Sequence, residues 1–233
     1  MGDLELLASG RDADVFALDE RRVLRRYRHG GDVRAEAEVM AYLAGRGLPV
    51  PTVYAADGAD LVLDRLTGPT MLRALLAGEL TPDAAAGILV ELQSALHAVP
   101  PMRSADPAEA ILHLDLHPDN IILDARGPVL IDWRNAAEGP PEFDVAMSAL
   151  ILAEVAVDRA GTLVPGAPAE LPGQAERMLV AFLAGSVRRP DGQLDRAADM
   201  RRGNITLSAA ERAQVDAAVE LVRRHTRRPS PPG

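Results

Sequence analysis

The sequence predicts an α+β fold in which a strand-rich N-terminal part precedes a mainly helical part. Residues 1–66 contain several short β-type patterns around one helical stretch, and helical patterns dominate after Leu66. In addition, two short apolar runs at 121–123 and 129–131 flank the turn-forming segment 124–127, which predicts a β-hairpin. We therefore expect a small sheet with one helix, followed by a helical lobe that contains this hairpin.

The N-terminal lobe, residues 1–66, is expected to combine a sheet with a single helix. Its predicted strands are Asp14–Leu18, Arg22–Tyr27 and Asp60–Leu66. The predicted helix runs from Val33 to Gly45, and the proline- and glycine-containing segment 47–51 ends it.

The second lobe, residues 67–226, is expected to be mainly helical. Helical patterns cover Thr70–Ala77 and a longer stretch that ends near His97, for which Thr81 is the predicted N-cap and Pro82 the first residue. The apolar run Val145–Val157 falls short of the ~20 residues that span a bilayer, so a buried helix is expected there. A Pro/Gly-rich connection, 161–173, separates later helices, and 227–233 is an expected flexible tail.

The composition excludes several classes of function. A formal net charge of -9 argues against nucleic-acid partners, because duplex binding rests on Lys and Arg that neutralise phosphates. Cysteine is absent, so disulfides and thiolate metal sites cannot form, and the cytoplasm is the expected compartment. The N-terminal residues lack the basic-then-apolar order of a secretory signal, and no membrane span is expected.

The densest group of chemically active residue types is His113-Leu-Asp-Leu-His-Pro-Asp-Asn120. Phosphoryl transfer needs a group that accepts the proton of the substrate hydroxyl, and oxygen ligands for Mg²⁺. Asp115 can be the proton acceptor. Asn120 and Asp132 can supply neutral and anionic oxygens from the two sides of the predicted hairpin.

This group, followed by Ile131-Asp-Trp133, resembles the corresponding motifs of the aminoglycoside phosphotransferases, a family of small-molecule kinases. The resemblance implies a two-lobed, protein-kinase-like fold and transfer of the γ-phosphoryl group of ATP or GTP to a hydroxyl of a small molecule. It implies Asp115 as catalytic base and Asn120 and Asp132 as Mg²⁺ ligands. His113 and Asp144 would hold the catalytic loop in shape.

The resemblance extends upstream, through looser motifs, to the nucleotide site. The segment 9–15, with its single glycine Gly10, stands where the family's phosphate-covering hairpin lies. Glu36 matches the acid that pairs with the ATP-holding basic residue, although Glu38 is an available neighbour. Asp64 and Leu66 fall in the hinge whose backbone binds adenine.

The basic residue that holds the nucleotide cannot be the family's lysine here, because every one of the 25 basic residues is arginine. The strand Arg22–Tyr27 offers Arg25 or Arg26. Side chains alternate along a strand, so Val23, Arg25 and Tyr27 share one face, with Val23 placed to contact adenine. This alternation favours Arg25. Arginine keeps the charge but is longer and planar, so reduced turnover is one consequence.

Three alternatives remain at this level. A pseudokinase would bind nucleotide without turnover, and the arginine in place of lysine motivates this reading. A metal-dependent hydrolase would use His113, Asp115 and His117 as zinc ligands. In the third, the cluster is an ordinary polar turn. The acceptor stays open among aminoglycosides, other antibiotics, amino alcohols and sugars, and the acidic net charge slightly favours a cationic one. The sequence does not indicate an oligomeric state.

Overall fold

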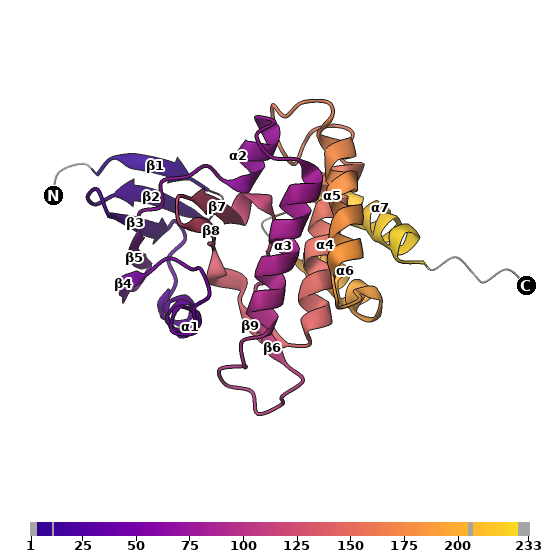
Figure 1. The fold of residues 1–233 in the computed structure, drawn as a ribbon. Helices are drawn as coiled ribbons and strands as arrows, with labels where there is room; N and C mark the ends of the chain where they lie inside the picture. Colours follow the sequence, from indigo (N-terminus) through magenta and orange to yellow (C-terminus); the bar gives the residue numbers. More distant parts are fainter. Residues whose placement is uncertain (1–3, 11, 205–206, 228–233) are drawn as a thin grey trace, which may run out of the picture.

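The N-terminal part folds as a five-stranded antiparallel sheet, in the order β1-β2-β3-β5-β4 (Figure 1). The computed structural model describes residues 4–10, 12–204 and 207–227. The strands are β1 Leu6–Ser9, β2 Ala13–Ala17, β3 Arg22–Tyr27, β4 Val53–Asp57 and β5 Asp60–Asp64. Helix α1, Arg34–Ala44, packs against β4 and buries Val39, Met40 and Leu43.

The C-terminal part is built mainly from helices. Helices α3 (Pro82–His97), α4 (Pro141–Val157), α5 (Leu171–Gly185) and α7 (Ala209–Thr226) pack side by side, with α6 (Leu194–Gly203) against α4 and α7 (Figure 1). The short helix α2, Met71–Leu76, precedes them. Thr70 and Thr81 cap α2 and α3, because each side chain accepts a hydrogen bond of 3.3 Å from a backbone N–H of the first turn.

Two small antiparallel pairs lie between the sheet and the helices (Figure 1). Strand β6 (Ala110–Leu112) pairs with β9 (Ala137–Gly139), and β7 (Ile121–Asp124) pairs with β8 (Gly127–Leu130). The 3₁₀ turn Pro118–Asn120 directly precedes β7 and the 3₁₀ turn Trp133–Asn135 follows β8, so both lie at the open end of the β7–β8 hairpin. Residues that are far apart in the sequence are thereby brought to one place.

The core of the helical part centres on α4. Most of its residues are buried, and its N-terminal turn reaches β6. A helix that is apolar on all sides is surrounded by protein rather than by one partner, and this explains the apolar run at 145–157. Within the described residues no helix is long and apolar enough to cross a membrane.

The structure confirms the α+β fold class and several element boundaries, and corrects others. Strand β3 and helix α3 have the predicted bounds, but β5 ends at Asp64, two residues before the predicted end. The sequence analysis missed β1, β4, β6 and β9. The lobe boundary at residue 66 stays a prediction, and most of the predicted tail, 228–233, lies outside the described residues.

Candidate active site

Asp115 lies in the loop that follows β6, and a buried network fixes the backbone of this loop. Leu114 has a φ of 61°, a left-handed conformation that is uncommon for a leucine. Its backbone N–H donates to Asp144 Oδ1 at 2.7 Å. His97 Nε2 donates to the other oxygen of Asp144 at 2.9 Å, and Gln93 donates to the same oxygen at 3.2 Å. The loop is therefore held by a carboxylate at the start of α4.

Asp144 is ionised in this network although it is fully buried. Burial opposes the charged form, but the hydrogen bond from His97, the charge of His97 and the Leu114 amide together hold the pKa of Asp144 below its ordinary value. The predicted role of Asp144 in shaping the loop has a physical basis in these contacts.

Asn120 stands beside Asp115 in the turn before β7. Its Nδ2 donates to the backbone oxygen of Asp115 at 2.9 Å and to Asp115 Oδ2 at 3.4 Å, and lies 3.2 Å from His117 Nε2. These contacts use the amide nitrogen. Within the described part of the chain, Oδ1 has no hydrogen-bond partner, so it can act as an oxygen ligand.

Asp132 follows the other strand of the same hairpin. The Ile131 N–H donates to the Asn120 backbone oxygen at 3.0 Å, which ties the two segments together. His113 is buried against Trp133, and its Nε2 donates to the Ile131 carbonyl at 3.0 Å. Asp132 itself has a φ of 65° and a side chain that is 39% exposed. Its carboxylate therefore lies at the surface of the site rather than in the core.

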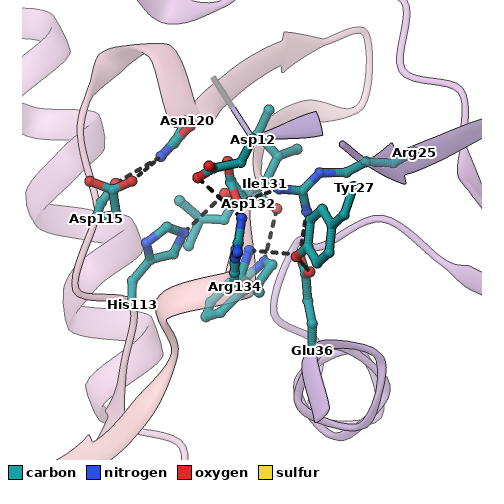
Figure 2. A network of polar contacts seen from close by, with 12 residues as sticks. Asp12, Arg25, Tyr27, Glu36, His113, Asp115, Asn120, Ile131, Asp132 and Arg134 are labelled. Atoms are coloured by element: carbon teal, nitrogen blue, oxygen red, sulfur yellow. Dashed lines mark hydrogen bonds and ion pairs between the residues drawn. The ribbon is translucent and has the colours of Figure 1, made fainter. Parts of the chain in front are cut away.

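Arg25 bridges the sheet to Asp132. Its Nη1 donates to Glu36 Oε1 at 2.5 Å, and its Nη2 donates to Asp132 Oδ1 at 2.5 Å. Tyr27 donates its hydroxyl to the other oxygen of Glu36, and the Trp133 N–H donates to Glu36 Oε1 at 3.1 Å. Figure 2 shows Asp132 between the pair Asp115–Asn120 and the group formed by Arg25, Tyr27 and Glu36.

This arrangement keeps Arg25 fully charged. Burial lowers the pKa of its guanidinium, but the carboxylates of Asp132 and Glu36 outweigh this and raise the pKa above the ordinary arginine value. Arg26 points away from this group and pairs with Asp60 at the surface, at 2.6 Å. Similarly, Glu38 pairs with Arg103 at the surface. The contact expected between a strand arginine and a helix acid is thus made by Arg25 and Glu36.

The remaining predicted nucleotide residues lie along the sheet. Val23 is buried on β3 opposite Leu63, and the Gly10 N–H closes the β1–β2 turn by donating to Ala13 at 2.9 Å. Asp64 ends β5, and its carboxylate accepts from the Tyr54 hydroxyl at 2.8 Å. Leu66 follows two residues later, half-buried. The structure thus groups Arg25 with Glu36 and Asp132, whereas Gly10, Asp64 and Leu66 lie at or just beyond the ends of strands β1 and β5.

The sequence analysis missed two parts of this site. Asp12, in the β1–β2 turn, pairs with Arg134 at 3.2 Å, so the turn is tied to the segment after Asp132 (Figure 2). No pattern in the sequence connects these two residues. The contact between Tyr27 and Glu36 could have been predicted from the sequence, because strand alternation already places Tyr27 on the same face of β3 as Arg25.

The donor set fits a magnesium ion better than zinc. Mg²⁺ prefers carboxylate and carbonyl oxygens, which Asp132 and Asn120 supply. Zinc would need a cluster of His, Cys or carboxylate ligands, and the described residues contain no group of three or more of these that could hold a metal. His113, one of the three proposed zinc ligands, is buried and uses Nε2 to bind a carbonyl. These residues therefore do not support a zinc-dependent hydrolase.

Solved structures similar to this chain include several aminoglycoside phosphotransferases. A streptomycin–ATP complex of APH(2'')-IIa aligns with a TM-score of 0.58 at 13% identity, covering 95% of this chain and 93% of that one. The ADP-bound APH(2'')-Ib gives 0.55 at 12%, covering 96% and 94%. A thermostable mutant of APH(4)-Ia gives 0.56 at 16%, covering 94% of each chain. At such identities, the likeness shows a shared kinase-like fold.

The family model gives the assignment that the structures alone cannot. No curated protein matches the chain significantly. The model of the phosphotransferase enzyme family, APH, matches residues 3–110 and 64–176, and so covers the sheet, the loop that contains Asp115 and both small strand pairs. Because these matches span more than half of the sequence, the chain belongs to the phosphotransferase enzyme family.

Proposed function

We propose that this phosphotransferase moves the γ-phosphoryl group of ATP or GTP to a hydroxyl group of a small molecule. The observation that carries the proposal is the meeting of Asp115, Asn120 and Asp132 around the end of one hairpin, with Arg25 beside them. Family neighbours in complexes with ATP and ADP support the choice of nucleotide.

Asp115 would orient the acceptor hydroxyl and take its proton. Its carboxylate is partly exposed, and Asn120 and the fixed backbone of Leu114 hold it in place. As the acceptor oxygen forms a bond to the γ-phosphorus, the bond to the leaving nucleoside diphosphate breaks. In this kind of transfer most of the catalysis comes from positioning and from stabilising charge, and the rigid loop serves the first need.

Asn120 and Asp132 would hold Mg²⁺, which neutralises charge on the triphosphate when bound. Arg25, oriented by Glu36, would contact the α- and β-phosphates. Gly10 would let the β1–β2 turn approach the phosphates, while Val23 and the backbone of Asp64 and Leu66 would hold the base. His113 would act as a positioning residue, because it holds the carbonyl just before Asp132.

A nucleotide-binding protein without turnover is the second candidate. One observation favours it: Arg25 occupies an oxygen of Asp132, a predicted metal ligand. The predicted cytoplasmic location, and the prediction that neither nucleic acid nor membrane is a partner, stay inferences from composition.

A comparison of wild type with Asp115→Asn separates these two candidates. The full chain is assayed with Mg²⁺ and ATP or GTP against a panel of hydroxyl-bearing metabolites and antibiotics. Loss of the proton acceptor should lower kcat by about 100- to 10,000-fold. Asp119→Asn, an exposed aspartate in the same loop, is the control and should leave the rate unchanged. Equal rates of Asp115→Asn and wild type with every acceptor would remove the catalytic claim.

A further inference from the structure

An ion pair connects the β1–β2 turn to the segment that follows Asp132 (Figure 2). Arg134 Nη1 lies 3.2 Å from Asp12 Oδ2, and the two side chains are 39% and 35% exposed. Arg134 comes two residues after Asp132 in the chain. The pair therefore joins the turn that is expected to cover the phosphates to the neighbourhood of the expected metal ligand.

The turn does not need this pair to keep its shape. The Gly10 N–H donates to the Ala13 carbonyl at 2.9 Å, and the Arg28 N–H donates to the Asp12 carbonyl at 2.9 Å. These backbone hydrogen bonds close the turn and attach it next to the end of β3. Exposed ion pairs contribute little to folding stability, because water solvates both charges well when they separate. The pair is therefore free to open without loss of the turn.

Arg134 has a second support that does not depend on Asp12. Its guanidinium carbon lies 4.6 Å from the centroid of the Tyr27 ring, within the distance of a cation–π contact. The ring itself is buried, and its hydroxyl donates to Glu36. If Asp12 releases the guanidinium, the Tyr27 ring still holds Arg134 at the site.

The guanidinium of Arg25 contacts the same ring, at 5.1 Å from its centroid, but it is more fully used. Both terminal nitrogens of Arg25 donate to carboxylates, those of Glu36 and Asp132, and its side chain is 11% exposed. Arg134 has one carboxylate partner among the described residues and is the more exposed of the two arginines. Arg134 is thus the guanidinium that is more available to a ligand.

The charges around the two arginines indicate which partner a triphosphate would replace. The carboxylates of Asp12, Glu36 and Asp132 outnumber the two guanidiniums by one. Glu36 and Asp132 both hold Arg25, whereas Asp12 contacts only Arg134 in the part of the chain that the structure describes. A triphosphate repels Asp12 and attracts Arg134, so its arrival favours an exchange of partners.

We propose that Arg134 is a second phosphate-binding residue, and that the triphosphate of the nucleotide replaces Asp12 as the partner of its guanidinium. In the free protein, the pair with Asp12 occupies this position. In the complex, the planar guanidinium donates to phosphate oxygens, whose geometry matches its fork of N–H groups. The inference rests on the proposed function for the presence of the triphosphate beside Asp132.

This exchange has a consequence that a simple brace would not have. Asp12→Asn and Arg134→Gln break the same ion pair. If the pair only held the turn in place, both variants would weaken nucleotide binding. If the triphosphate competes with Asp12 for Arg134, loss of the Asp12 charge strengthens binding and loss of the Arg134 charge weakens it.

Isothermal titration calorimetry on the full chain with Mg²⁺ tests the proposal, with AMP-PNP and GMP-PNP as probes. Arg134→Gln should weaken binding of the analogue that wild type prefers by about tenfold or more, because a charged hydrogen bond to phosphate is lost. Asp12→Asn should strengthen binding by about threefold, because one repelling charge is removed. Arg134→Lys keeps the charge without the planar fork, and should fall between Arg134→Gln and wild type.

The ion pair between Arg26 and Asp60 provides matched controls on the same sheet. Its nitrogen and oxygen are 2.6 Å apart, and its side chains are 47% and 35% exposed. Arg26→Gln and Asp60→Asn should each bind the analogue as wild type does. All of these substitutions are at partly exposed side chains, so the variants should fold, and thermal melting of each one checks this.

Weaker binding in both Asp12→Asn and Arg134→Gln, or unchanged binding in either, would overturn the proposal. If in that case phosphoryl transfer still depends on Asp115, the proposed function stands and only the exchange fails. If the two variants have opposite effects but Asp115→Asn matches wild type with every acceptor, the triphosphate site stands and the catalytic claim fails. Absence of binding of both analogues to wild type would overturn both proposals.

Discussion

On the helical side of the site, Asp115 is held by Asn120, whose Nδ2 donates to its backbone and carboxylate oxygens, and the loop is anchored to the buried Asp144. On the sheet side, Arg25 is held between two carboxylates, Glu36 and Asp132. The first network is complete without a ligand. In the second, Arg25 donates to Asp132 Oδ1, so a metal ion bound by Asp132 shares this carboxylate with the guanidinium.

Because of this difference, the two sides should respond differently to mutation. Changes in the Asp144 network should reduce folding stability, because they leave buried polar groups without partners. Changes on the Arg25 side should mainly alter the binding of nucleotide and metal, since part of this site is exposed and its charges can find other partners.

Asp144→Ala should have the largest effect on stability. It removes the acceptor for the Leu114 N–H and for His97, all within the core. We expect a loss of about 3 kcal/mol in the free energy of unfolding, measured by urea denaturation. Asp216→Ala, at an exposed ion pair, is the control and should change stability by about 0.5 kcal/mol or less. A similar small change in both variants would mean that Asp144 does not anchor the loop.

Gly68→Ala tests the connection between the two sides. A Cβ at Gly68 would lie 1.8 Å from the Leu123 carbonyl oxygen, so the segment before α2 would have to move away from β7. We expect a loss of about 2 kcal/mol in the free energy of unfolding. The same substitution at Gly87, in α3, meets no atom within 4 Å and should be neutral or stabilising by about 1 kcal/mol. Equal effects at the two glycines would contradict this close contact.

The pH dependence of stability provides a second test of the Asp144 network. The folded-state pKa of Asp144 lies below its ordinary value, so the network stabilises the protein above the ordinary pKa of Asp, and this contribution is lost as the pH falls through the folded value. Below pH ~4, wild type should lose up to about 1.4 kcal/mol per pH unit through this group. Asp144→Asn should flatten this part of the curve in acid denaturation; an unchanged slope would exclude Asp144 as its source.

Arg25→Lys should have the smallest effect on stability. Lysine keeps the charge but lacks the planar fork with which Arg25 binds two carboxylates. We expect a loss of about 1 kcal/mol, seen as a fall in Tm of roughly 2–4 °C, and a nucleotide Kd within about tenfold of wild type by calorimetry. Arg26→Lys, at the exposed pair with Asp60, should leave both quantities unchanged. A larger loss of stability for Arg25→Lys than for Asp144→Ala would contradict the expectation that the Asp144 network contributes more to folding than the Arg25 side.

The sequence predicted the elements that have strong local patterns. Helix α3 begins and ends as predicted, because Thr81 and Pro82 mark its start and its apolar spacing continues to His97. Alternation along β3 also identified Arg25 rather than Arg26 as the residue that meets Glu36. The motif spacing indicated that Asn120 and Asp132 lie on one hairpin.

The rest depended on tertiary contacts. Strand β1 is exposed along its whole length and shows no alternation, so its sequence gave no strand signal. The ion pair between Asp12 and Arg134 forms only when the chain folds. The same is true of the contact between Arg25 and Asp132, which are 107 residues apart in the sequence. The pair Glu154–Arg201 likewise does not follow from local sequence, because α4 and α6 meet only after packing.

The most direct test of the shared metal site is the binding of Mn²⁺, as a substitute for Mg²⁺, in the presence of the non-hydrolysable nucleotide AMP-PNP, followed by electron paramagnetic resonance. Wild type and the control Asp119→Asn should bind Mn²⁺ equally, whereas Asn120→Ala and Asp132→Asn should each weaken binding by about tenfold or more. Mn²⁺ binding that is unchanged in both variants would contradict the claim that these two residues hold the metal ion next to Asp115.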